Sequence, residues 1–135
     1  MIAKRTDSGH EGVRVLVVDD EREFVDTLVK RLGKRGLLCE GAYSGGEALA
    51  VVRDHDFDVV LLDMRLPDAD GNEVLRAIKK IKPATQVVIL TGHISTRDGV
   101  EGLDRGANSY LMKPVEFESL FESLQRAHLS RGVLA

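Results

Sequence analysis

Five polar residues stand at the ends of apolar runs, and their types could do chemistry together. They are Asp19, Asp20, Asp63, Thr91 and Lys113. Crowded carboxylates resist joint ionisation and call for a divalent cation, and Mg²⁺ prefers such oxygen ligands. A hydroxyl and an ammonium group can neutralise the oxygens of a transferring phosphoryl group. Each residue alone is explained as a helix cap, a turn residue or a surface lysine, so the chemistry depends on whether the fold brings them together.

The hydrophobic pattern predicts the elements that would position these residues. Short apolar runs indicate buried strands, and apolar residues at helical spacing follow each of them. The expected strands cover residues 13–18, 37–42, 59–62, 86–90 and 109–112. Two of the expected helices cover residues 21–32 and 95–105. Another is opened by a capping box at Ser44-Gly-Gly-Glu47, and another is capped by Asp70 and ended by Pro83. The last begins near Pro114.

Alternating strands and helices predict an α/β fold, with a parallel sheet covered by helices on both faces. Right-handed crossovers put the carboxyl ends of all its strands at one edge. The polar residues that end the first, third, fourth and fifth strands should therefore converge. Nothing comparable ends the second strand, and no phosphate-binding glycine pattern surrounds the Gly45-Gly46 pair that follows it.

Composition favours a single globular domain. The chain has 135 residues, of which 43% are apolar, and a net charge of −3, so it has no basic field for nucleic acid or anionic membranes. Its one cysteine excludes an intrachain disulfide, and its four histidines lack zinc-ligand spacing. No apolar run suits a membrane span or a signal peptide, which predicts a cytoplasmic protein. We expect a flexible leader over residues 1–12, the domain over 13–129 and a short tail over 130–135.

Four motifs occur in one order along most of the chain: VLVVDDE, LLDMRLPDADG, VVILTG and YLMKPV. With these motifs the chain resembles the receiver domain of response regulators in two-component signalling, over about residues 13–127. The resemblance implies a doubly wound, flavodoxin-like sheet of five parallel strands in the order 2-1-3-4-5 with five helices. It places the site at the switch point between the first and third strands.

The resemblance also implies roles for the polar residues. Asp63 would accept a phosphoryl group from a sensor histidine kinase or a phosphotransfer protein. Asp20 and Asp63 would bind Mg²⁺ directly, with Mn²⁺ as a substitute, while Asp19 would bind it through water and Arg65 would contribute its backbone carbonyl. Lys113 would hold a second phosphoryl oxygen, and the peptide bond that follows it would be cis.

The expected output is a change in conformation. Phosphorylation would draw Thr91 inward and let Tyr110 follow, which would alter the face made by helix four, strand five and helix five. That face would control a partner or an effector domain absent from this chain, and it could form a dimer. By the same resemblance, Arg65 and His93 take positions where bulky side chains would shield the phosphoryl group from water.

Two other functions remain open at this point. A haloacid-dehalogenase-type phosphohydrolase also uses an aspartate nucleophile, but it would need D-x-D after the first strand, where position 21 is Glu. A receiver-like module could act independently of phosphorylation, although all the key groups are present here. Because the chain ends shortly after the last helical stripe, it could be a stand-alone regulator or a receiver cut from a longer one.

Overall fold

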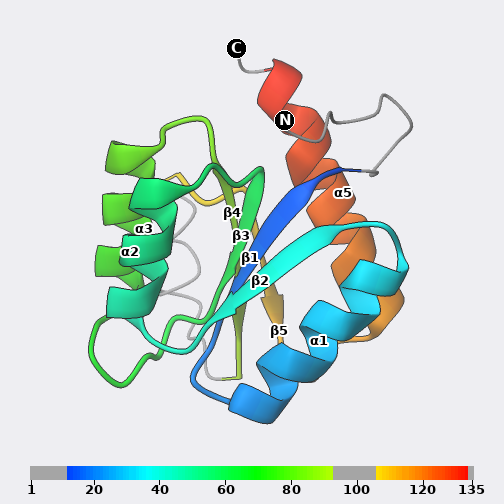
Figure 1. Cartoon of the computed structure of the whole chain (residues 1–135), viewed down its shortest axis with the longest axis horizontal. Helices are drawn as coiled ribbons and strands as arrows, with labels where there is room; N and C mark the ends of the chain where they lie inside the picture. The colour runs from blue at the N-terminus through cyan, green and yellow to red at the C-terminus, as the bar shows by residue number, and fades with distance from the viewer. Residues whose placement is uncertain (1–11, 93–105, 134–135) are drawn as a thin grey trace.

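The computed structural model describes residues 12–92 and 106–133 (Figure 1). These residues form one parallel sheet in the order β2-β1-β3-β4-β5, which confirms the predicted doubly wound α/β fold. The strands are β1 (Arg14–Val18), β2 (Leu38–Ala42), β3 (Val59–Leu62), β4 (Gln86–Thr91) and β5 (Ser109–Met112). The helices are α1 (Arg22–Lys34), α2 (Gly45–Asp54), α3 (Gly71–Ile81) and α5 (Phe117–Val133). The helix expected at 95–105, and His93, lie outside the described residues.

Helices cover both faces of the sheet, with α1 and α5 on one side and α2 and α3 on the other (Figure 1). Successive residues of a strand point to opposite faces. In β3, Val59 and Leu61 therefore join the core under α1 and α5, while Val60 and Leu62 join the core under α2 and α3. This burial on both faces explains why the strand is a continuous apolar run.

The helix boundaries follow local capping, with some differences from the expected ones. The α1 helix continues through Gly33 to Lys34 instead of stopping at Leu32, and the chain turns at Gly36, whose φ is +94°. The α3 helix has the complete capping box at Asp70. The Asp70 cap satisfies N–H groups that have no partner within the helix.

The expected capping box of α2 is only half formed. The Ser44 hydroxyl accepts a hydrogen bond from the Glu47 N–H. The Glu47 carboxylate, however, accepts from the Tyr43 N–H at 3.0 Å rather than from Ser44. The start of α2 is therefore tied to the residue that precedes its cap.

The peptide bond between Lys113 and Pro114, just after β5, is cis, as the resemblance implied. The α5 helix follows and extends past residue 129 to Val133, so the expected domain boundary falls inside it. No helix within the described ranges is long and apolar enough to cross a membrane.

Candidate functional site

Two neighbouring strands deliver their terminal acids to the same edge of the sheet. Val18 of β1 is paired with Leu62 of β3, so Asp19 and Asp63 follow matched positions. The Asp63 N–H donates to the Val18 carbonyl at 2.9 Å, which continues the ladder by one bond. Asp19 is 2% exposed and Asp63 is 7% exposed, whereas Asp20 faces solvent. The backbone pairing thus fixes both buried carboxylates side by side.

The three carboxylates form one cluster. Oxygens of Asp19, Asp20 and Asp63 all lie within 4.8 Å of one another. Like charges at this separation repel, and burial of two of them weakens screening by water. A hard divalent cation such as Mg²⁺ takes oxygen ligands and relieves that repulsion, so this donor set fits it.

Lys113, which follows β5, reaches across the edge into this cluster. Its Nζ donates to Asp19 Oδ2 and to Glu21 Oε1, both at 2.6 Å, and lies 3.9 Å from Asp63 Oδ2. Burial disfavours the ammonium, but its hydrogen bonds to Asp19 and Glu21 and the charges of Asp19 and Asp63 outweigh this and raise the pKa of Lys113. The side chain therefore remains a cation at the site.

Two residues at the start of α1 also hold Lys113, and neither was predicted from the sequence to have this role. Glu21 is the third acid of the DDE run, and its position directly after the cluster was the available signal. Phe24 lies under the ammonium, with Nζ 4.7 Å from the ring centroid, which is within the range of a cation–π contact. The helical spacing of Phe24 indicated only a core residue.

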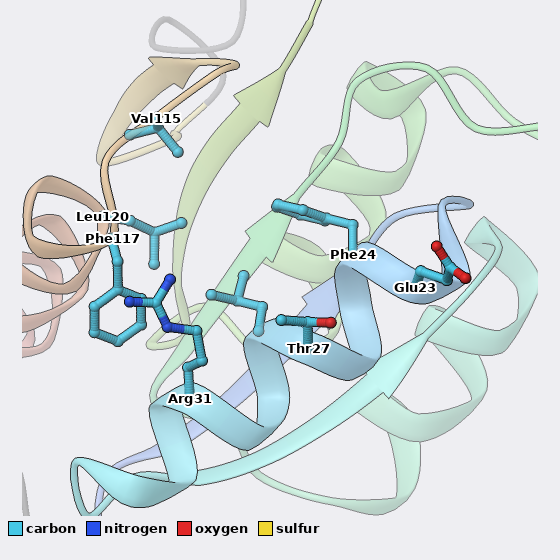
Figure 2. A pocket seen from close by; sticks show the side chains of 8 residues that line it. Glu23, Phe24, Thr27, Arg31, Val115, Phe117 and Leu120 are labelled. Carbon is cyan, nitrogen blue, oxygen red and sulfur yellow. The ribbon is translucent and has the colours of Figure 1, made fainter.

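A groove of about 310 Å³ borders the site between α1 and α5 (Figure 2). Phe24 and Leu28 line it from α1, and Val115 and Leu120 line it from the opposite side. At the far end of the groove from Phe24, the Arg31 guanidinium lies 4.1 Å from the centroid of the Phe117 ring. The contact between Arg31 and Phe117 joins α1 to the segment that follows Lys113. It therefore supports the contacts of the lysine with Glu21 and Phe24.

Of the remaining expected residues, Arg65 and Thr91 lie at this edge of the sheet, whereas Tyr110 lies inside β5, opposite Ile89 of β4. The Arg65 N–H donates to Asp63 Oδ1 at 3.1 Å, and the Arg65 side chain is exposed. Thr91 ends β4 opposite Met112 of β5. Tyr110, also on β5, is 41% exposed. Five polar residues were predicted to converge. The structure brings four of them together, namely Asp19, Asp20, Asp63 and Lys113. The fifth, Thr91, lies at the end of the adjacent strand β4.

Comparisons with known proteins agree with this geometry. The family model described as "Response regulator receiver domain" matches residues 15–125. The transcriptional regulatory protein ZraR of Salmonella typhimurium is 41% identical over 115 residues, which is 85% of this chain but 26% of that protein. TcrA of Mycobacterium tuberculosis is 39% identical over 121 residues, 90% of this chain and 47% of that protein. The chain thus spans between about a quarter and a half of the length of these relatives.

Solved structures match over nearly the whole chain. A CheY-like receiver domain protein from Methanospirillum hungatei superposes with a TM-score of 0.88 and 31% identity, covering 93% of this chain and 100% of that one. A response regulator from Burkholderia pseudomallei, whose structure contains a phosphorylated aspartic acid and a calcium ion, has a TM-score of 0.80 and 29% identity over 91% of this chain and 73% of that one. The fold, the family model and these relatives together show that this chain belongs to the response regulator receiver domain family of two-component signalling.

Proposed function

We propose that this domain accepts a phosphoryl group on Asp63 and uses the modification as a signal. The observation that carries the proposal is the cluster itself: three carboxylates with oxygens within 4.8 Å of one another and the Lys113 ammonium 3.9 Å from Asp63. Crowded carboxylates repel one another and lower the stability of the fold. Such arrangements are therefore concentrated at sites that bind ligands or carry out chemistry. The phosphorylated aspartic acid in the Burkholderia pseudomallei relative supports the same assignment.

The proposed transfer is an attack by an Asp63 carboxylate oxygen on phosphorus. A new oxygen–phosphorus bond forms as the bond from phosphorus to the donor's leaving atom breaks. Lys113 would turn its ammonium toward one phosphoryl oxygen, and the Thr91 hydroxyl would donate to another. Mg²⁺, held by Asp20, Asp63 and the Arg65 carbonyl and through water by Asp19, would neutralise charge on the carboxylates and the phosphoryl group.

The phosphodonor would be a sensor histidine kinase or a phosphotransfer protein, or in vitro a small acyl phosphate. The domain would not be an enzyme acting on a separate substrate, because it would catalyse only its own phosphorylation and dephosphorylation. A cytoplasmic location follows from this role and stays a prediction. The output would pass to a partner or to an effector domain, and the relatives ZraR and TcrA, which are longer than this chain, are named as transcriptional regulatory proteins.

The proposed output surface includes β5, at the edge of the sheet. Two large side chains of this strand, Tyr110 and Met112, are 41% and 50% exposed, so the strand offers apolar area to a partner or to a second copy. Phosphorylation adds about −1.5 to −2 charges at Asp63. Movement of Thr91 toward this charge would leave a space that the Tyr110 side chain could enter. The shape of the surface around β5 would then change.

Shielding by Arg65 and His93 would set the lifetime of the phosphoryl group. If the two side chains exclude attacking water, the double substitution of Arg65→Ala and His93→Ala should speed phosphate loss. The measurement is the rate of release from labelled protein, with each single substitution as a control. Unchanged release from the double variant would end this assignment.

One experiment separates the proposal from its alternatives. The protein is incubated with a small acyl phosphate and Mg²⁺, and separately with phosphomonoesters. Stable labelling at Asp63 is the expected result. Turnover of phosphomonoesters would instead indicate a hydrolase of the haloacid-dehalogenase type, and no reaction with either compound would indicate an interaction module independent of phosphorylation.

A further inference from the structure

The loop that joins β3 to α3 is fastened near both ends. Close to its start, the Arg65 N–H donates to Asp63 Oδ1 at 3.1 Å, and Arg65 forms an isolated antiparallel bridge with Asp70. At its end, the Gly71 N–H donates to the Met64 carbonyl at 2.9 Å. A Cβ on Gly71 would lie 2.4 Å from Met64 Cα, so only glycine allows this closure. The loop is a closed structure whose first residues contact the Asp63 carboxylate directly.

Asp68 fastens the middle of this loop to another element, α2. Its Oδ1 accepts from the Gly45 N–H at 2.8 Å, and its Oδ2 accepts from the Gly46 N–H at 2.9 Å. These N–H groups belong to the first turn of α2, where donors have no partner within the helix and the dipole favours an anion. The hydrogen bonds from Gly45 and Gly46 hold the pKa of Asp68 below its usual range. The glycine pair that could suggest a phosphate loop thus binds a carboxylate of the chain itself.

Close packing accompanies these hydrogen bonds. A Cβ added to Gly45 would lie 3.0 Å from the Ala69 Cβ and 3.0 Å from the Val74 Cγ2. Ala69 belongs to the loop and Val74 to α3, so both press against the first turn of α2. Asp68 is therefore the polar part of a tight contact between the loop and α2, and the contact has little room to shift.

We propose that Asp68 is a positioning residue for the candidate cation site: it anchors the loop on α2, and the anchored loop keeps Asp63 and Arg65 in the arrangement that binds the cation. This inference rests on the proposed function of Asp63. The physical link is the Arg65 N–H, which holds one of the two Asp63 carboxylate oxygens. A loop released from α2 lets the backbone at Arg65 move, and the Asp63 carboxylate then loses its fixed orientation. Outer groups that orient ligands in this way affect metal affinity strongly.

The test compares Asp68→Ala with Ser44→Ala. Ser44 caps the same helix through its bond to the Glu47 N–H, but that bond does not involve the loop. Both variants should lower the melting temperature, because each removes acceptors from the first turn of α2. Only Asp68→Ala should weaken Mg²⁺ binding, by about tenfold, at the low end of the effect of such supporting groups. Asp68→Asn, which keeps one good acceptor, should fall between the parent and Asp68→Ala.

The readouts are the Mg²⁺ dissociation constant by calorimetry and the amide resonances of Gly45, Gly46 and Arg65. In Asp68→Ala the Arg65 resonance should shift or broaden, and in Ser44→Ala it should match the parent. Mg²⁺ affinity that is unchanged in Asp68→Ala, or reduced equally in Ser44→Ala, would overturn the positioning role. A parent protein that neither binds Mg²⁺ nor accepts phosphoryl groups would instead overturn the proposed function, so the two failures are distinguishable.

Discussion

The two ends of β3 each carry a buried carboxylate, and the two carboxylates have different surroundings. Asp58, just before the strand, is 0% exposed, and Asp63, just after it, is 7% exposed. The Asp58 carboxylate accepts from the Arg14 N–H at 2.8 Å and has the His128 ring nitrogen 4.0 Å away. The Asp63 carboxylate also accepts from a backbone N–H, that of Arg65, but it has two other acids beside it and the Lys113 ammonium 3.9 Å away. The two carboxylates are buried to a similar extent, but the charged groups that surround them differ.

This difference shows that burial of an acid does not by itself identify a site. A backbone N–H that donates to a buried carboxylate stabilises its charged form and also satisfies a donor that would otherwise be unpaired. Asp58 can therefore contribute to the stability of the sheet. Like charges gathered around Asp63 act in the opposite direction, because they repel one another.

The largest effect that we expect is on labelling by an acyl phosphate. Asp63→Asn should abolish it completely, since the amide is not a competent nucleophile, and the fold should persist. Asp58→Asn is the matched control, because it makes the same chemical change at the other end of the strand and keeps an acceptor for the Arg14 N–H. Labelling is followed by autoradiography, and circular dichroism checks the fold. Label retained on Asp63→Asn would mean that the nucleophile is a different residue.

The next largest effect concerns stability, where the two ends should respond by different amounts. Asp58→Ala should lower the free energy of unfolding by about 1–3 kcal/mol, because the Arg14 N–H loses its acceptor. Asp63→Ala also removes an acceptor, that of the Arg65 N–H, but without divalent cations the relief of repulsion should offset this loss, so the free energy of unfolding should change by less than about 1 kcal/mol. Urea unfolding of both variants measures the difference. If both substitutions destabilise the protein equally, the distinction between the two ends fails.

A smaller effect should follow from removing the lysine that offsets the charge on Asp63 and its neighbours. Lys113→Ala should cost about 1 kcal/mol without Mg²⁺, because Asp19 is buried and loses a charged donor. Saturating Mg²⁺ should reduce that cost, since the cation would neutralise the same carboxylates. Lys82→Ala is the control: its partner Asp56 is 80% exposed, and such surface pairs contribute at most about 1 kcal/mol. If the cost of Lys113→Ala does not change with Mg²⁺, Lys113 and the cation do not neutralise the same carboxylates.

The sequence pattern alone predicts a parallel sheet and the gathering of the acids because both follow from regular rules, whereas the order of the strands was implied by the resemblance to receiver domains. Apolar runs mark the strands, and parallel pairing puts Asp19 and Asp63 at one edge. The contact between Lys113 and Glu21 is different, since it joins residues 92 positions apart through side-chain positions that no periodic pattern encodes. The pairing of Asp68 with Gly45 and Gly46 has the same character.

Local propensity also misplaced one boundary. The expected helix over 21–32 ends just before Gly33, since an interior glycine costs about 1 kcal/mol relative to alanine. The helix nevertheless continues to Lys34, because the burial of Leu32 at 0% exposure keeps its last turn against the sheet. Tertiary packing here outweighs the preference of a single residue, and a single sequence does not contain that balance.

The most direct test of the central claim is to map the modified residue in the parent protein. After incubation with an acyl phosphate and Mg²⁺, mass spectrometry of the intact chain and of its peptides shows how many phosphoryl groups were added and where. The account predicts a single group, on Asp63, that does not form when the cation is removed by a chelator. A phosphoryl group on Asp19, Asp20 or any other residue, or no modification despite bound Mg²⁺, would contradict it.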